Sequence, residues 1–383
     1  MALTDYKPGL EGVVAAQTRM SMVDGQAGVL VIGGFLLEEL ALNATFEETV
    51  FLLWNDRLPN VAELKDFRQQ LASRRELPPI AFDVLRAAAA QKAPVMDALR
   101  MAGSTLSLRT AGESLDGLDA NHRDALVAVA RFPTIVAAYW RILNGQEPIK
   151  PRADLNHAAN YLYMIFGEEP TAERTRGMET YLNTVIDHGL NASTFTARVI
   201  VATQSDIISS VIGAVGALKG PLHGGAPGPA LDMVFEVGTE ENAEPVLRKI
   251  IERGDRLMGF GHRVYKVRDP RADVLATAAV RLFERGGDMK LYNLARHVEK
   301  VALRLLEEYK PGRNLQTNVE FFTALILHGL GLETDLFAPT FAVSRVGGWT
   351  AHCFEQIGEG RLIRPQSIYT GPQDRKWVPV EKR

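Results

Sequence analysis

The segment from Met258 to Arg271, MGFGHRVYKVRDPR, concentrates residue types that could do chemistry. A histidine, His262, lies between two preceding glycines and a basic cluster formed by Arg263, Lys266, Arg268 and Arg271. Glycine lets the backbone approach a ligand closely, and guanidinium or ammonium groups pair with anionic groups. The segment fits an anionic substrate whose carbonyl must be polarised, and it fits a solvated basic turn equally well.

A second histidine, His223, lies in the glycine- and proline-rich stretch Gly220–Pro229, GPLHGGAPGP. This stretch cannot continue a helix and separates two long helical blocks, so it is a plausible hinge between a large and a small domain. The positive end of the helix expected near Pro229 disfavours a protonated imidazole. A neutral His223 could donate a hydrogen bond to a carbonyl oxygen that gains negative charge, or it could be a turn histidine satisfied by the backbone.

Two charged residues lie in apolar surroundings. Glu320 precedes the apolar run Phe321–Leu327, where a carboxylate has a raised pKa and is a better base. The alternative is a glutamate favoured by the dipole at a helix start. Arg345 is the only Asp, Glu, Lys or Arg between Asp335 and Glu355. A buried guanidinium needs a partner, which could be a substrate carboxylate or an acid from elsewhere in the chain.

Two further residues give weaker signals. His188 ends an expected helix before Gly189, where a histidine can simply interact with the last carbonyls. Arg364 has apolar neighbours, but the nearby Arg361 is typical of surface charge. Two carbonyl-polarising histidines, a base and several carboxylate-binding arginines together suit carbon–carbon bond formation, in which a carbon next to one carbonyl is deprotonated and attacks another.

Composition narrows the classes of protein. A chain of 383 residues with 46% hydrophobic and 23% charged residues is typical of a soluble globular protein of about two domains. A net charge of −3 argues against general nucleic-acid binding. The single cysteine, Cys353, excludes a disulfide within the chain and a cysteine-based metal cluster. The sequence shows no secretory signal and no bilayer-spanning window, so we expect a cytoplasmic protein with no membrane partner.

Known nucleotide and metal motifs are missing from the sequence. It has no HExxH motif, no GxxxxGK[ST] loop and no GxGxxG after a strand. Zinc hydrolases and the nucleoside triphosphate or dinucleotide folds therefore lack support, and no metal is expected.

Helical periodicity dominates the chain, which predicts an all-α fold. Caps at Thr45 and Asn60 begin two helices, of which the first matches a capping box. The remaining helical patterns cover residues 95–109, 121–144, 154–166, 171–189, 207–218 and 289–310. Strand signals are limited to Val13–Ser21 and Val29–Ile32, which could form one hairpin around an Asp24-Gly25 turn.

Eight segments resemble, in order, the motifs of the citrate synthase family: GLEGV at 9–13, FEETVFLLW at 46–54, HGLNASTFTARV at 188–199, LKGPLHGGAPGPA at 218–230, MGFGHRVYKVRDPR at 258–271, NVEFF at 318–322, FAVSRVGGWTAH at 341–352 and RLIRPQSIYTGP at 361–372. Each is modest alone, but together they span nearly the whole chain. The chain looks most like the short, dimeric bacterial and archaeal type.

The resemblance implies a two-domain, all-α homodimer that condenses acetyl-CoA with oxaloacetate and water to give citrate and CoA, the first step of the tricarboxylic acid cycle. A large domain would comprise residues 1–225 and 331–383, and a smaller, mobile domain residues 226–330. The CoA thioester is a substrate, so no separate cofactor is implied. The only β-structure expected is the short N-terminal hairpin.

The resemblance also implies roles for individual residues. His223 would stabilise the enol of the thioester, His262 would polarise the oxaloacetate ketone, and Glu320 would remove a proton from the acyl-CoA methyl group. Four residues match oxaloacetate-binding positions, the last of them reaching the site from the other subunit: His188, Arg271, Arg345 and Arg364. Arg263 and Lys266 fall in the segment that contacts CoA phosphates.

One position departs from the family pattern, and three other functions remain as alternatives to citrate synthesis. The family base is usually aspartate, whereas this chain has Glu320, and the extra methylene must be accommodated by a backbone that is set back. A close alternative is 2-methylcitrate synthase acting on propionyl-CoA, because one methylene is worth only about 1–3 kcal/mol in a pocket. A citryl-CoA-cleaving lyase and a catalytically silent helical scaffold are the other readings.

Overall fold

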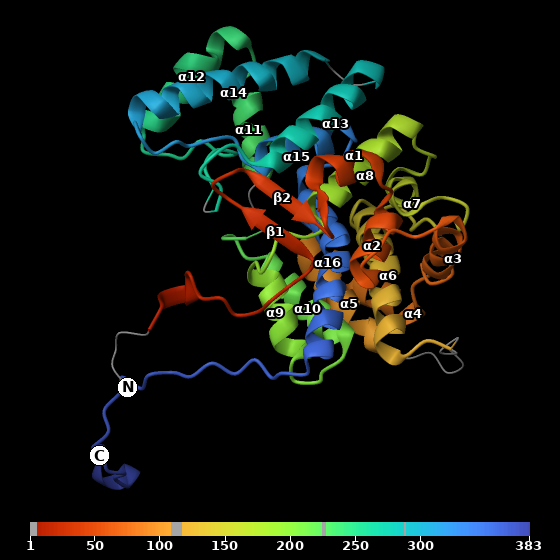
Figure 1. The fold of residues 1–383 in the computed structure, drawn as a ribbon, viewed down its shortest axis with the longest axis vertical. Coiled ribbons are helices and arrows are strands. Elements are labelled where there is room, and N and C mark those ends of the chain that lie inside the picture. The colour runs from red at the N-terminus through yellow and green to blue at the C-terminus, as the bar shows by residue number, and fades with distance from the viewer. Residues whose placement is uncertain (1–5, 109–116, 224–226, 263, 287–288) are drawn as a thin grey trace.

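The computed structural model describes residues 6–108, 117–223, 227–262, 264–286 and 289–383. It is mostly helical, as the sequence predicts (Figure 1). The helices before the glycine-rich stretch are α1 Leu37–Asn43, α2 Phe46–Asn55, α3 Val61–Ala72, α4 Pro79–Ala90, α5 Val95–Ser104, α6 Ala120–Leu143, α7 His157–Phe166, α8 Ala172–Val185, α9 Ala192–Val201 and α10 Ile207–Leu218. Those after it are α11 Pro227–Val237, α12 Ala243–Glu252, α13 Pro270–Gly286, α14 Met289–Tyr309, α15 Val319–Gly329 and α16 Phe337–Glu359. Short 3-10 turns occupy Pro8–Leu10, Thr105–Ser107, Glu240–Asn242, Thr334–Leu336 and Val380–Lys382.

A hairpin is present and its second strand lies where predicted, but its first strand, β1, shares only Ser21 with the predicted Val13–Ser21, and a third strand follows. β1 Ser21–Asp24, β2 Val29–Ile32 and β3 Phe35–Leu36 form an antiparallel sheet in the order β1-β2-β3. Ser21 pairs with Ile32 and Asp24 with Val29. Because β2 offers only four residues for pairing, the apolar residues between Val13 and Ser21 have no partner strand and stay outside the sheet.

Side-chain caps determine where several helices begin. Thr45 and Asn60 both form complete capping boxes, with Glu48 and Glu63 respectively. The helix predicted from residue 154 begins instead at His157, because the Asn156 side chain accepts a hydrogen bond from a backbone N–H of its first turn.

Helix α8 ends earlier than predicted, and this places His188. The prediction ran to residue 189, but α8 stops at Val185. The Arg345 Nε donates a hydrogen bond to the Val185 carbonyl at 2.7 Å, and Ser344 donates one to Leu182. Carbonyls at the end of α8 are thus used by α16, and His188 lies in the loop that follows, not on the helix.

The core is built around α16, with α6, α9, α10, α2 and α8 packed against it (Figure 1). In the part of the chain that the structure describes, α6 alone is a single helix long and apolar enough to cross a membrane, and a second such span arises only if α15 and residues 334–359, bent by 118°, are joined. The apolar window of α6 is 72% buried inside the fold. This burial is what a core helix requires.

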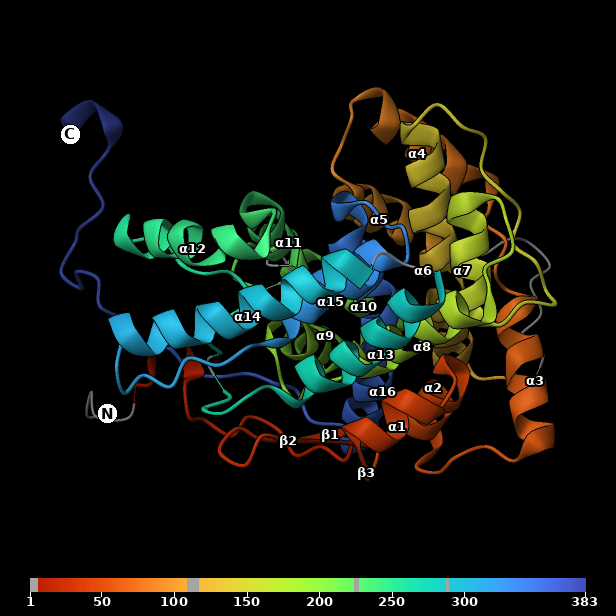
Figure 2. The ribbon, with the colours of Figure 1, turned by 90° about the horizontal axis from the view of Figure 1, so that it is seen from above.

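Helices α11 to α15 lie beside this core. α13 packs against α15 and also against α8 and α1, whereas α12 and α14 pack on each other farther out (Figure 2). The segment between Leu257 and Pro270 connects α12 to α13 and carries His262. The start of α15 meets this segment, since Phe260 bridges Thr317.

The C-terminal residues 361–383 extend away from the helical body (Figure 1). Large apolar side chains on this tail are exposed: Leu362, Ile368, Tyr369, Trp377, Val378 and Val380. The N-terminal segment also leaves the body and exposes Tyr6 and Val14. These termini have too few contacts within the chain to bury their apolar residues.

Candidate active site

His188 and His262 lie side by side although 74 residues separate them. Their ring centres are 5.8 Å apart, and the His188 Nε2 lies 3.0 Å from the Tyr265 hydroxyl. Burial holds the pKa of His188 well below its usual value, and the positive charges of Arg271 and Arg345 lower it further. His188 is therefore a neutral polar group at neutral pH.

The backbone fixes which nitrogen of His262 carries its hydrogen. The His262 Nδ1 accepts hydrogen bonds from the backbone N–H groups of Val264 and Tyr265, both at 3.1 Å. Burial, followed by the charge of Arg271, lowers the pKa of His262 to about 4. The Arg271 Nη2 lies 3.4 Å from the other ring nitrogen, Nε2, a longer contact than the two backbone hydrogen bonds to Nδ1. A neutral ring that accepts at Nδ1 carries its hydrogen on Nε2, so His262 can donate to a substrate carbonyl.

A close backbone approach holds this segment against the N-terminal hairpin. The Lys266 backbone N–H donates a hydrogen bond to the Gly25 carbonyl at 2.8 Å. A Cβ added at Gly25 would lie 2.2 Å from the Val264 carbonyl oxygen. The turn between β1 and β2 therefore needs glycine at this position so that the hairpin can support the His262 segment.

Arg271 is buried at the start of α13 and paired with an acid. Its Nη2 donates to Asp269 Oδ2 at 2.7 Å and its Nε donates to Oδ1 at 3.0 Å. Burial opposes the charge of Arg271, but the Asp269 carboxylate raises the arginine pKa overall. The guanidinium keeps its charge and has N–H groups beyond those that Asp269 uses.

Glu320 lies in the first turn of α15, after the N-cap Asn318. The side chain keeps part of its surface exposed, but burial raises its pKa to about 7. Arg271 and Arg345 lower that pKa and Asp269 raises it. The carboxylate makes no hydrogen bond or ion pair with another described residue, which leaves it available as a base. Both predictions for Glu320 hold: it starts a helix and it has a raised pKa.

Arg345 is the buried cation that the sequence predicts. Only 1% of its surface is exposed, and its guanidinium lies 4.5 Å from the centre of the Phe341 ring. It forms no ion pair with any acid in the described ranges. Burial lowers its pKa to about 10, while Asp187 and Glu320 favour the charged form. Because no acid pairs with it, this guanidinium is a candidate for a substrate carboxylate.

His223 follows α10 and contacts α9 and α16 through one hydroxyl. Its Nε2 lies 2.9 Å from the Ser193 Oγ, which accepts a hydrogen bond from the buried Trp349 Nε1 at 3.1 Å. Burial, and then the charge of Arg345, lower the pKa of His223 to about 4. The Ser193 hydrogen is shared between two acceptors, His223 Nε2 and Asn191 Oδ1. When it goes to His223, the other ring nitrogen carries a hydrogen and can donate to a carbonyl oxygen.

Three predicted residues are not part of this cluster. Arg364 lies exposed in the C-terminal segment that follows α16. Lys266 is exposed next to the site, and Arg263 lies outside the described residues. Arg268, a member of the basic segment, is instead bound to Asp273 and Glu299, both at 2.5 Å.

The sequence reading missed three polar groups that hold the site. Asp269 anchors Arg271, Tyr265 contacts His188, and Ser193 contacts His223. Of these, Asp269 had a signal, because an acid directly before Pro270 at a helix start is typical of a cap. In the described parts of the chain, no group of three or more His, Cys, Asp or Glu residues is placed to hold a metal ion.

Comparison with known proteins assigns the family. The family described as citrate synthase, C-terminal domain, matches residues 9–366. Citrate synthase 2 of Bacillus subtilis is 43% identical over 98% of this chain and 98% of its own length. A 2-methylcitrate synthase of Shewanella oneidensis is 36% identical over 98% of this chain and 97% of its own length.

Solved structures agree with the sequence comparison. The ternary complex of carboxymethyl coenzyme A and oxaloacetate with citrate synthase of Thermoplasma acidophilum superposes with a TM-score of 0.88 at 30% identity, covering 99% of this chain and 100% of that one. The helical fold and its small N-terminal sheet are those of this family. The chain therefore belongs to the citrate synthase family and is an acyltransferase of the tricarboxylic acid cycle.

Proposed function

We propose that the chain condenses acetyl-CoA with oxaloacetate at the cluster of His188, His223, His262, Arg271, Glu320 and Arg345. The observation that carries this proposal is the state of Glu320. Its pKa is raised to about 7, and the charges of Arg271 and Arg345 act on it. A carboxylate poised near neutral pH, beside two buried cations and neutral histidines, is suited to removing a proton next to a carbonyl.

The first step is proton removal from the acetyl-CoA methyl group. Glu320 takes the proton, and negative charge moves to the thioester oxygen. His223 donates a hydrogen bond to that oxygen, because its low pKa keeps the ring neutral and a neutral donor matches the basicity of an enolate. Ser193 orients the ring by contact with its other nitrogen.

The second step is attack of the enol carbon on the oxaloacetate ketone. His262 passes its Nε2 proton to the ketone oxygen as that oxygen becomes an alcohol, and the proton that Glu320 took from the methyl group returns to the ring, which restores a neutral His262 and an ionised Glu320. Arg271 and Arg345 bind the two carboxylates of oxaloacetate, with His188 as a further donor. Water then hydrolyses the citryl-CoA thioester to citrate and CoA. The relative from Thermoplasma acidophilum, solved with oxaloacetate and a CoA analogue, supports this substrate pair.

Domain motion and a dimer complete the proposal. Residues 226–330 would form a small domain that closes on residues 1–225 and 331–383, and Lys266 with Arg263 would contact CoA phosphates. The exposed apolar tail supports a homodimer, since residues 361–383 project from their own body. In such a dimer the tail would bring Arg364 to the partner's oxaloacetate site.

The alternative substrate is propionyl-CoA, because 2-methylcitrate synthases are nearly as similar in sequence. The test is CoA release from oxaloacetate with acetyl-CoA and propionyl-CoA in parallel. We expect a higher kcat/KM for acetyl-CoA. A higher value for propionyl-CoA would assign the chain to the alternative, and no CoA release with either would refute both.

A further inference from the structure

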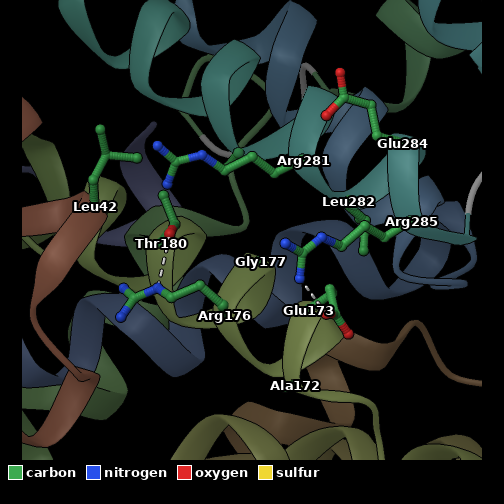
Figure 3. Close-up of a pocket in the computed structure, with 11 residues that line it drawn as sticks. Leu42, Ala172, Glu173, Arg176, Gly177, Thr180, Arg281, Leu282, Glu284 and Arg285 are labelled. Carbon is green, nitrogen blue, oxygen red and sulfur yellow. Dashed lines mark hydrogen bonds and ion pairs between the residues drawn. The ribbon is translucent and has the colours of Figure 1, made fainter.

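A cavity of about 430 Å³ lies where α8 packs against α13, and it does not include any residue of the cluster described above (Figure 3). Its walls are Leu42 of α1, residues of α8 between Ala172 and Thr180, and residues of α13 between Ala278 and Arg285. The volume is within the range of small-molecule sites. The cavity therefore lies between the two parts of the chain that we propose as large and small domains.

Three arginines line the cavity, and they differ in how many of their N–H groups already donate to other residues of the chain. Arg176 donates to the carbonyl oxygens at the end of α1, those of Ala41, Asn43 and Ala44. Arg285 pairs with Glu173 at 2.8 Å across the two helices. Arg281 is exposed and forms no hydrogen bond or ion pair with another residue in the described parts of the chain.

The three guanidinium groups are arranged around a common space. Figure 3 shows those of Arg281 and Arg176 on either side of Thr180, with Arg285 directed toward Glu173. Two acids, Glu173 and Glu284, also line the cavity, so the guanidinium groups outnumber the carboxylates. Free guanidinium groups bind phosphate and carboxylate in a bidentate manner.

Both helices lead from this cavity to the candidate active site. α8 runs from Glu173 and Thr180 in the cavity to its end at Val185, just before His188. α13 carries Arg271 at its start and Arg281 ten residues later, about 15 Å along the helix axis. The relative position of α8 and α13 therefore sets how His188 and Arg271 meet.

We infer that this cavity binds a small multivalent oxyanion through Arg281 and Arg285, and that the bound anion favours the arrangement of α8 and α13 in which His188 and Arg271 are aligned. Arg281 and Arg285 belong to α13, whereas Arg176 and Thr180 on the opposite wall belong to α8. An anion that contacts both walls stabilises the state in which both sets of contacts exist. By linkage, it strengthens oxaloacetate binding. The effect of the anion on oxaloacetate binding rests on the proposed function, through the roles of His188 and Arg271. Binding of the anion to the cavity does not.

Binding is tested by calorimetry on the full chain with inorganic pyrophosphate and, separately, tricarballylate. Oxaloacetate and CoA are present throughout to fill the active site. We expect saturable binding of at least one anion to the wild type and to Arg86→Ala, an exposed arginine on α4 that serves as the control. Arg281→Ala and Arg285→Ala should lose it. No binding of either anion, or binding that Arg281→Ala leaves intact, would overturn the site.

Coupling is tested by the KM for oxaloacetate at saturating acetyl-CoA, with and without the anion that binds. We expect the KM to fall about fivefold in the wild type and to stay constant in Arg281→Ala, whose activity without the anion is unchanged. A constant KM in the wild type would overturn the coupling. Binding without any CoA release would contradict the proposed function but not the anion site.

Discussion

Asp269 holds Arg271 through three hydrogen bonds, from the Arg271 backbone N–H and Nε at 3.0 Å each and from Nη2 at 2.7 Å. The Asp269 Oδ2 also accepts from the backbone N–H of Val319 at 3.2 Å. Val319 directly precedes Glu320 at the start of α15. One buried carboxylate thus ties a proposed oxaloacetate-binding arginine to the helix that carries the proposed base.

Replacing this carboxylate tests the link. Asp269→Asn keeps the shape but leaves the Arg271 charge uncompensated, so we expect the free energy of unfolding to fall by about 3–5 kcal/mol. Misplacement of the substrate groups should lower kcat/KM roughly a hundredfold. Urea denaturation and steady-state kinetics measure both. The matched control is Asp273→Asn, an exposed acid that pairs with Arg268, for which a change under about 1 kcal/mol is expected. Equal effects of the two variants would contradict the proposed link.

The pH dependence of kcat/KM should report Glu320 and not the histidines. A base must be ionised, so kcat/KM for acetyl-CoA should rise with pH and level off above the Glu320 pKa of about 7. His223 and His262, each with a pKa of about 4, stay neutral throughout this range. A pH profile between 5 and 9 checks this. An acid limb with its midpoint at or below 5 would be inconsistent with the raised pKa.

The same pKa has a consequence for stability. The folded chain keeps the Glu320 proton to higher pH than the unfolded chain, whose glutamate titrates near 4.5. This group therefore favours the folded state less as pH rises from about 4.5 to 7. Glu320→Gln removes that contribution, so its stability relative to wild type should increase over this interval in denaturation curves measured at each pH.

Arg345 should contribute little to the stability of the substrate-free protein but be necessary for substrate binding. Arg345→Met removes a buried cation that has no acidic partner among the described residues, and this gain offsets the lost hydrogen bond from its Nε to the Val185 carbonyl, so we expect the substrate-free stability to stay close to that of the wild type. The kcat/KM should fall roughly a hundredfold or more, because a substrate carboxylate loses a buried charge partner. Thermal unfolding with and without oxaloacetate gives the decisive comparison. Oxaloacetate should raise the Tm of the wild type and not that of the variant. An equal Tm increase in both would rule out this role.

Arg364 should act in the partner's site. Arg364→Ala and Glu320→Gln should each be nearly inactive alone. Mixing them under conditions that exchange subunits should restore activity, because a hybrid dimer contains one site with both native residues. A mixture that stays as inactive as its components, while chromatography shows hybrid dimers, would place Arg364 outside the site.

The sequence predicted a residue's burial where its neighbours along the chain are also its neighbours in space. Arg345 and Glu320 were identified because each has apolar neighbours along the chain, and such neighbours predict burial. His188 and His262 were singled out by residue type, but their 5.8 Å approach depends on how α8, the N-terminal hairpin and the segment before α13 pack.

Other features could not be read from a single sequence. Ser193 and Tyr265 give no local signal, since each matters only through a histidine from a distant segment. Both ends of the first strand were wrong: apolar residues after Val13 suggest a strand that ends at Ser21, whereas pairing with the four residues of β2 places β1 at Ser21–Asp24. The end of α8 was wrong because α16 side chains take its last carbonyls.

The most direct test of the account is the activity of Glu320→Gln with acetyl-CoA and oxaloacetate. Glutamine keeps the size of the side chain but cannot accept the methyl proton, so we expect kcat to fall roughly a thousandfold. Circular dichroism and the Tm increase caused by oxaloacetate should match the wild type, since Arg271 and Arg345 are intact. A variant that folds, binds oxaloacetate and keeps kcat within a few-fold of the wild type would show that Glu320 is not the base.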